Sequence, residues 1–213
     1  MSFPLGQYNA FFFDFDGVIV DSLDIKTDAF GDLFKEYGEE VVQEVRAYHL
    51  DNGGVSRYDK FRYYFRHLLN REITQEIIDT LDKQFSRLVV EKVIEAPFIE
   101  GVIDVVGQLN EQGRDCFIIS ATPQGEIRSI VERRAIEHLF KEIVGSPQTK
   151  SKNLEYLLDK YKIEGDNALY FGDARSDYLA AQEHSVAFIG VGKKNQELNS
   201  IKGIRVISDF KEL

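Results

Sequence analysis

The stretch Phe11–Ser22 reads FFFDFDGVIVDS and places two aspartates, Asp14 and Asp16, within one of the most apolar parts of the chain. A carboxylate is costly to bury unless it is neutralised or finds a partner. The run Ala10–Phe15 has the length of a strand and does not alternate, which is typical of a parallel strand buried on both faces. We therefore expect Asp14 and Asp16 to stand at the end of such a strand.

After this stretch, the spacing of apolar residues changes once along the chain. Apolar residues recur at helical spacing from about 22 to 95, whereas after Pro97 strand-like runs alternate with helical ones, at 115–120, 142–145, 168–172, 186–190 and 205–207. Alternation of this kind is typical of a parallel sheet with helices on both faces. We predict an α/β protein with a Rossmann-like parallel core (residues 1–20 and 97–213) and an all-helical insertion after the first strand (residues 21–96).

Composition excludes several classes of protein. The 213 residues carry a formal net charge of −10, which argues against a nucleic-acid-binding surface. The single cysteine, Cys116, cannot form an internal disulfide, which fits a reducing compartment. We see no signal peptide and no apolar segment long enough to span a membrane. The chain is therefore expected to be cytoplasmic, with no membrane or nucleic-acid partner.

Polar residues follow the predicted core strands. Ser120 ends the second strand, Lys150 follows the third, and Asp173 and Asp177 follow the fourth. Because parallel strands end at one edge, these groups should converge with Asp14 and Asp16 in a single crevice. Four clustered carboxylates repel one another, and a divalent cation resolves this; oxygen ligands favour Mg²⁺.

These motifs resemble those of the haloacid dehalogenase superfamily of phosphohydrolases. The segment 14–22 (DFDGVIVDS) matches its DxDGxxxDS motif, Ser120 matches its strand-ending hydroxyl, and 172–177 (GDARSD) matches its GDxxxD motif. The insertion corresponds to the helical cap of the phosphoglycolate phosphatase-like branch. The sequence departs from the pattern at Ala121, where an asparagine is common, and at Lys150, which no proline follows; Lys152 is the other candidate for the lysine motif.

The resemblance implies a role for each matching residue. Asp14 would be the nucleophile that forms an aspartyl-phosphate, and Asp16 would protonate the leaving oxygen and then activate water. Both should point the same way on a regular strand. Mg²⁺ would be bound by Asp14, the backbone carbonyl of Asp16, and Asp173, with Asp177 nearby. The phosphate-binding residues would be Ser120, Ala121, Lys150 and Gly17, where the glycine lets the backbone pass close to the phosphate.

Substrate specificity is expected to lie in the insertion. Gly54 permits a loop to approach the crevice closely, and Arg57 could pair with an anion. The alternative is that Arg57, Lys60 and Arg62 form only a solvated helix face. Ser22 is expected to cap the first helix of the insertion rather than take part in the chemistry.

The leading functional hypothesis is a Mg²⁺-dependent phosphomonoesterase acting on a small phosphorylated metabolite. A phosphomutase resembling β-phosphoglucomutase shares the first motif and is the alternative among enzymes. A receiver-like phospho-accepting signalling or binding protein is the alternative of another class, although it needs no helical insertion. A dehalogenase would lack the group at Asp16, and a phosphonatase would need a lysine of the insertion placed for Schiff-base chemistry.

Overall fold

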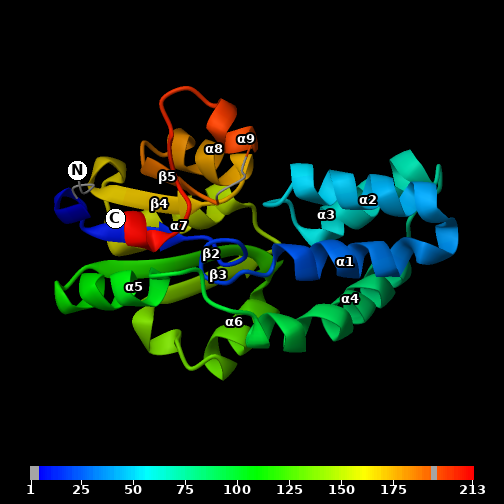
Figure 1. Cartoon of the computed structure of the whole chain (residues 1–213), viewed down its shortest axis with the longest axis horizontal. Helices are drawn as coiled ribbons and strands as arrows, with labels where there is room; N and C mark the ends of the chain where they lie inside the picture. The colour runs from blue at the N-terminus through cyan, green and yellow to red at the C-terminus, as the bar shows by residue number, and fades with distance from the viewer. Residues whose placement is uncertain (1–4, 193–195) are drawn as a thin grey trace.

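A parallel sheet forms the centre of one lobe of the protein, as a computed structural model that describes residues 5–192 and 196–213 shows (Figure 1). The six strands have the order β3-β2-β1-β4-β5-β6, and all adjacent pairs are parallel. They are β1 (Ala10–Phe13), β2 (Asp115–Pro123), β3 (Glu142–Ser146), β4 (Ala168–Gly172), β5 (Ala187–Val191) and β6 (Arg205–Ile207). The predicted α/β class is confirmed, and the order reverses between β1 and β4, where ligands bind in such sheets.

The apolar run at the start of the chain forms the buried centre of this sheet. Phe11 and Phe13 face one core cluster and Phe12 faces the other. The first cluster includes residues of α5 (Val102–Glu111) and α6 (Gln124–Arg133), and the second includes residues of α7 (Lys150–Tyr161) and α8 (Arg175–Glu183). Burial on both faces explains why the run is continuously apolar. The short helix α9 (Gln196–Ser200) lies between β5 and β6 in the chain.

Two elements end earlier than the sequence predicts. Strand β1 ends at Phe13 rather than Phe15, so Asp14 and Asp16 follow the strand and do not share its regular alternation. Between the strand-like runs at 115–120 and 142–145 the sequence predicts a helix over about 124–139. In the structure this helix ends at Arg133, and Ala135 then takes a positive φ of 58° before a short 3-10 turn at Glu137–Leu139. That left-handed residue breaks the helical hydrogen-bond pattern.

Four helices of the insertion form a second lobe beside the sheet (Figure 1). They are α1 (Leu23–Phe34), α2 (Glu39–Asp51), α3 (Arg57–Tyr63) and α4 (Gln75–Glu95). A cluster of buried rings fills the space between them, formed by Phe30, Phe34, Phe61, Tyr64 and Phe85. Side-chain oxygens cap two of these helices: Ser56 accepts the Asp59 N–H and Thr74 accepts the Ile77 N–H.

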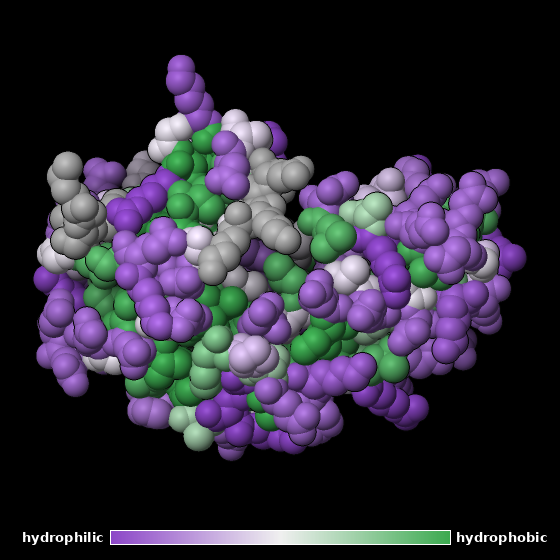
Figure 2. Space-filling model, viewed as in Figure 1, coloured by the Kyte–Doolittle hydropathy of each residue, from purple (hydrophilic) through white to green (hydrophobic). Residues whose placement is uncertain are grey.

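The surface of the insertion is mainly hydrophilic in the view of Figure 2. This agrees with helices that bury an apolar stripe against one another and present polar residues to water. Within residues 5–192 and 196–213, no helix combines the length and the apolar character that crossing a bilayer requires.

Candidate active site

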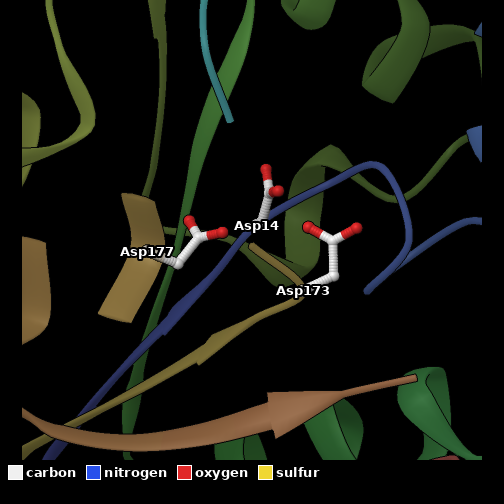
Figure 3. A group of neighbouring side chains, drawn as sticks. All are labelled: Asp14, Asp173 and Asp177. Atoms are coloured by element: carbon white, nitrogen blue, oxygen red, sulfur yellow. The ribbon is translucent and has the colours of Figure 1, made fainter. Parts of the chain in front are cut away.

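Three aspartates meet beyond the carboxyl ends of β1 and β4. Asp14 directly follows β1, Asp173 directly follows β4, and Asp177 lies in the first turn of α8. One oxygen from each lies within 4.8 Å of the others. Figure 3 shows the three side chains gathered around a common space. The structure thus brings together three of the four aspartates that the sequence analysis placed at a metal site.

Lys150 is the cation of this aspartate cluster. Its Nζ lies 2.7 Å from Asp14 Oδ2 and 2.6 Å from Asp177 Oδ1, and its side chain is buried. The Tyr170 hydroxyl also donates to Asp177, at 2.9 Å. Lys152, the other candidate of the sequence analysis, is exposed. Because Lys150 is the first residue of α7, its side chain reaches the strand ends directly.

The aspartate cluster carries more negative charge than this lysine can balance. Burial raises the pKa of Asp14 to about 6, and Asp177 and Asp16 add to the rise while Lys150 opposes it. Burial, with Asp14 and Asp177, also raises the pKa of Asp173. Three carboxylates with one lysine fit a divalent metal ion, whose charge would offset their repulsion, and a donor set made only of oxygens suits a hard cation.

Gly17 is needed where the chain passes the aspartate cluster. Its φ is +78°, and a Cβ at this position would lie 2.4 Å from Asp173 Oδ2. Any other residue would therefore be strained in its backbone and would collide with that carboxylate. The structure places Gly17 against a candidate metal ligand, whereas the sequence analysis expected it beside the phosphate.

Asp16 has a different set of partners from Asp14. Its carboxylate accepts hydrogen bonds from Ser22 Oγ at 2.6 Å and Thr122 Oγ1 at 3.2 Å, and it forms an ion pair with Lys26. Burial alone would raise the pKa of Asp16, but Lys26 and the two hydroxyls hold it below its usual value. The Asp16 carboxylate is therefore a separate charged centre from the aspartate cluster.

The role expected of Ser22 was wrong, and Lys26 was missed. Ser22 precedes α1 but makes no side-chain capping hydrogen bond, because its hydroxyl donates to Asp16 instead. Lys26 also donates to Thr122 Oγ1, at 2.8 Å. The available signal was spacing: Ser22 and Lys26 are four residues apart, so a helix starting there presents both on one face.

Residues of strand β2 form the wall of the cavity next to Asp14 and Asp16. Strand β2 extends to Pro123, so Ser120 and Ala121 lie within it rather than at its end. Ser120 is buried, and its Oγ accepts the Thr122 N–H at 3.1 Å. Ala121 lines the same cavity as the two aspartates.

The loop between α2 and α3 approaches the core, as the sequence analysis expected. Gly53 and Val55 line the cavity that contains Asp14 and Asp16. A Cβ on Gly54 would lie 1.8 Å from Ser176 Oγ on α8, so a larger residue here would require Ser176 to move. Gly54 thus meets the wall of the core beside the cavity.

Arg57 joins the insertion to the core. Its guanidinium pairs with Glu126, on core helix α6, and with Asp82, on α4, at 3.1 Å. It also donates to Ser86 at 2.9 Å, and it lies over the Phe85 ring. Only 4% of Arg57 is exposed, so the protein's own carboxylates already compensate its charge.

The alternative that Lys60 belongs to a solvated helix face is wrong, because the structure buries this residue. It is 1% exposed and lines the cavity, whereas half of the Arg62 side chain is exposed. Lys60 Nζ lies 2.7 Å from Nδ1 of His49, another buried residue of the cavity wall. The insertion therefore does place a lysine at the cavity, contrary to the argument that disfavoured a phosphonatase.

Comparisons with known proteins agree with this geometry. A family model described as haloacid dehalogenase-like hydrolase matches residues 11–191. Two curated proteins named phosphoglycolate phosphatase are similar: that of Aliivibrio fischeri is 27% identical (94% of this chain and 92% of the relative), and that of Mannheimia succiniciproducens is 26% identical (87% and 85%). The solved structure of β-phosphoglucomutase from Clostridium difficile has a TM-score of 0.80 at 17% identity, covering 97% of this chain and 93% of that one, a likeness of fold alone.

Proposed function

The chain belongs to the haloacid dehalogenase-like hydrolases, and we propose that it is a Mg²⁺-dependent phosphatase that hydrolyses a small phosphorylated metabolite through an aspartyl-phosphate. One observation carries this proposal: Asp14 and Asp16 line one cavity but have separate charge partners. A nucleophile and a proton-transfer group in different surroundings suit a two-step displacement. We assign residues 1–20 and 97–213 to the catalytic core and 21–96 to its cap.

In the first step, an Asp14 oxygen attacks phosphorus while Asp16 donates a proton to the departing alcohol oxygen. In the second, Asp16 removes a proton from the water that attacks the aspartyl-phosphate, which frees phosphate and regenerates Asp14. Lys150 and the Phe15 N–H, which donates to Asp14 Oδ1 at 2.7 Å, orient the nucleophile. Lys26 holds Asp16 ionised, the form that activates water; the first step requires this ion pair to loosen when substrate binds.

Residues at the ends of several strands would bind the phosphoryl group together. Ser120, the backbone at Ala121, and Lys150 would hold its oxygens. Asp14, Asp173 and Asp177 would bind Mg²⁺, with the Asp16 carbonyl as a further oxygen ligand; the bound ion supplies positive charge against the phosphoryl oxygens.

The proposal is tested by turnover of p-nitrophenyl phosphate and a panel of small phosphomonoesters, with metal-free protein and after Mg²⁺ is restored. We expect free phosphate only with the metal. After an acid quench during turnover, we expect phosphate bound covalently to Asp14. Folded, metal-loaded protein that turns over no member of the panel would contradict the proposal. Isomerised sugar phosphate would instead support a mutase, and phosphorylation without turnover would support a receiver-like protein.

A further inference from the structure

Lys60 brings a buried positive charge to the cap side of the cavity, opposite Asp14 and Asp16. Its side chain lines the same cavity as both aspartates. Among the described residues, its Nζ has one hydrogen-bond partner, His49 Nδ1. The Asp173 and Asp16 carboxylates stabilise the charged form of Lys60, but among the described residues no carboxylate forms an ion pair with it.

The other two cations of this cavity are paired differently. Lys26 forms an ion pair with Asp16, and Arg57 forms ion pairs with Glu126 and Asp82. In the part of the chain that the structure describes, Lys60 alone among these three cations forms no ion pair. Lys60 is therefore the cation of this cavity that is available to bind an anionic group of a ligand.

His49 does not neutralise Lys60. Burial, followed by the positive charges of Lys60 and Lys26, lowers the pKa of His49 to about 2, so the ring is neutral and accepts from Lys60 through Nδ1. Burial and Lys26 also lower the pKa of Lys60, to about 7. Burial is the largest cause for both groups, and at Lys60 the Asp173 and Asp16 carboxylates offset it only in part.

A purely structural role explains Lys60 poorly. A buried charge without an ion pair is costly, and an apolar side chain of similar volume is often neutral or stabilising at such a site. The Phe30 ring, with its centroid 5.4 Å from Nζ, offers only a weak cation–π contact. A cation kept at this cost beside a reactive centre suits recognition of an anion.

We propose that Lys60, supported by His49, forms an anion-binding subsite in the cap that recognises a second negatively charged group on the substrate. The cavity is small, about 40 Å³, which favours a compact molecule. The substrate class is thus a small phosphomonoester that also carries a carboxylate or a second phosphate. This inference rests on the proposed phosphatase function and adds the chemistry of the group that is not cleaved.

The experiment compares 2-phosphoglycolate, its neutral amide 2-phosphoglycolamide, and ethane-1,2-diol bisphosphate. We expect kcat/KM for an anionic compound to exceed that for the amide by at least about tenfold, mainly through KM. Preference for the carboxylate or for the bisphosphate identifies the second group. Lys60→Met should reduce the preference to within about threefold, and so should Lys60→Gln, which retains hydrogen bonding to His49. Lys92→Met, an exposed lysine of the cap helix α4, should retain it.

Binding calorimetry in an Asp14→Asn background separates this inference from the proposed function. The same preference, and its loss with Lys60→Met, should appear in the Kd values even where no turnover is measured. Equal affinity for 2-phosphoglycolate and its amide would overturn the inference, and so would a preference that both Lys60 variants keep. Absence of phosphomonoester turnover with the binding preference intact would overturn only the phosphatase. Thermal unfolding of each variant checks that it is folded.

Discussion

The two sides of the active-site cavity carry opposite charge. On the sheet side, three aspartates share one lysine, Lys150. On the insertion side, Lys26, Arg57 and Lys60 line the same cavity. The sheet side therefore suits a metal ion and a reacting phosphoryl group, whereas the insertion side suits proton control, attachment to the core and recognition of the rest of the substrate. Each variant below tests one part of this division.

Asp14→Asn should have the largest effect. The amide cannot attack phosphorus, so we expect turnover to fall by about 10⁴-fold or more, with the fold intact. Release of phosphate and thermal unfolding measure the two properties. Asp21→Asn, an exposed aspartate of the same motif, is the matched control and should keep wild-type turnover. Near-normal turnover by Asp14→Asn would contradict the assignment of Asp14 as the nucleophile on the sheet side.

Lys150→Met should come next. The phosphoryl oxygens lose a cation and kcat/KM should fall by about 10²–10³-fold. Asp14 and Asp177 also lose a buried ion pair, so the free energy of unfolding without metal should fall by about 3 kcal/mol. Lys152→Met changes an exposed lysine two residues away and should affect neither quantity. If Lys152→Met gave the larger loss of activity, the lysine would be misassigned.

Much of the sheet side could be predicted from the sequence. Phe11–Phe13 identify a strand buried on both faces, and carboxyl ends of parallel strands meet at one edge wherever the strands lie in the chain. Asp173 could thus be placed near Asp14 without any contact being known. The shared direction of Asp14 and Asp16 could not be deduced in this way, because β1 ends before both of them.

The insertion side was less predictable because its contacts depend on how helices pack. On α3, Arg57 and Lys60 are buried whereas Arg62 is exposed, although all three occur in a charged run typical of a solvated face. Which face meets a second lobe depends on partners distant in sequence, such as Glu126 for Arg57. Spacing within the helix cannot supply that information.

Arg57→Met tests whether this residue attaches the cap or recognises substrate. It leaves Glu126 without its buried partner, so the free energy of unfolding should fall by about 3 kcal/mol, measured by denaturant titration. KM should rise by a similar factor for every phosphomonoester. Arg62→Met, which breaks an exposed pair with Asp59, should cost less than about 1 kcal/mol. A rise in KM confined to one substrate, with unchanged stability, would instead make Arg57 the specificity residue that the sequence analysis expected.

Ser22→Ala should give the smallest effect and probes the contact between the two sides. The Ser22 hydroxyl is one of the groups that hold the pKa of Asp16 low, so its loss should move the acidic limb of the rate of aspartyl-phosphate hydrolysis, the step in which Asp16 acts as a base, to higher pH. One hydrogen bond contributes about 1 kcal/mol, which corresponds to about fivefold in rate. Thr27→Ala is the control, because the Thr27 hydroxyl donates only to the Leu23 carbonyl within α1. An acidic limb unmoved by Ser22→Ala would mean that Asp16 does not set it, and the proton-transfer group would have to be sought among the other residues of the cavity.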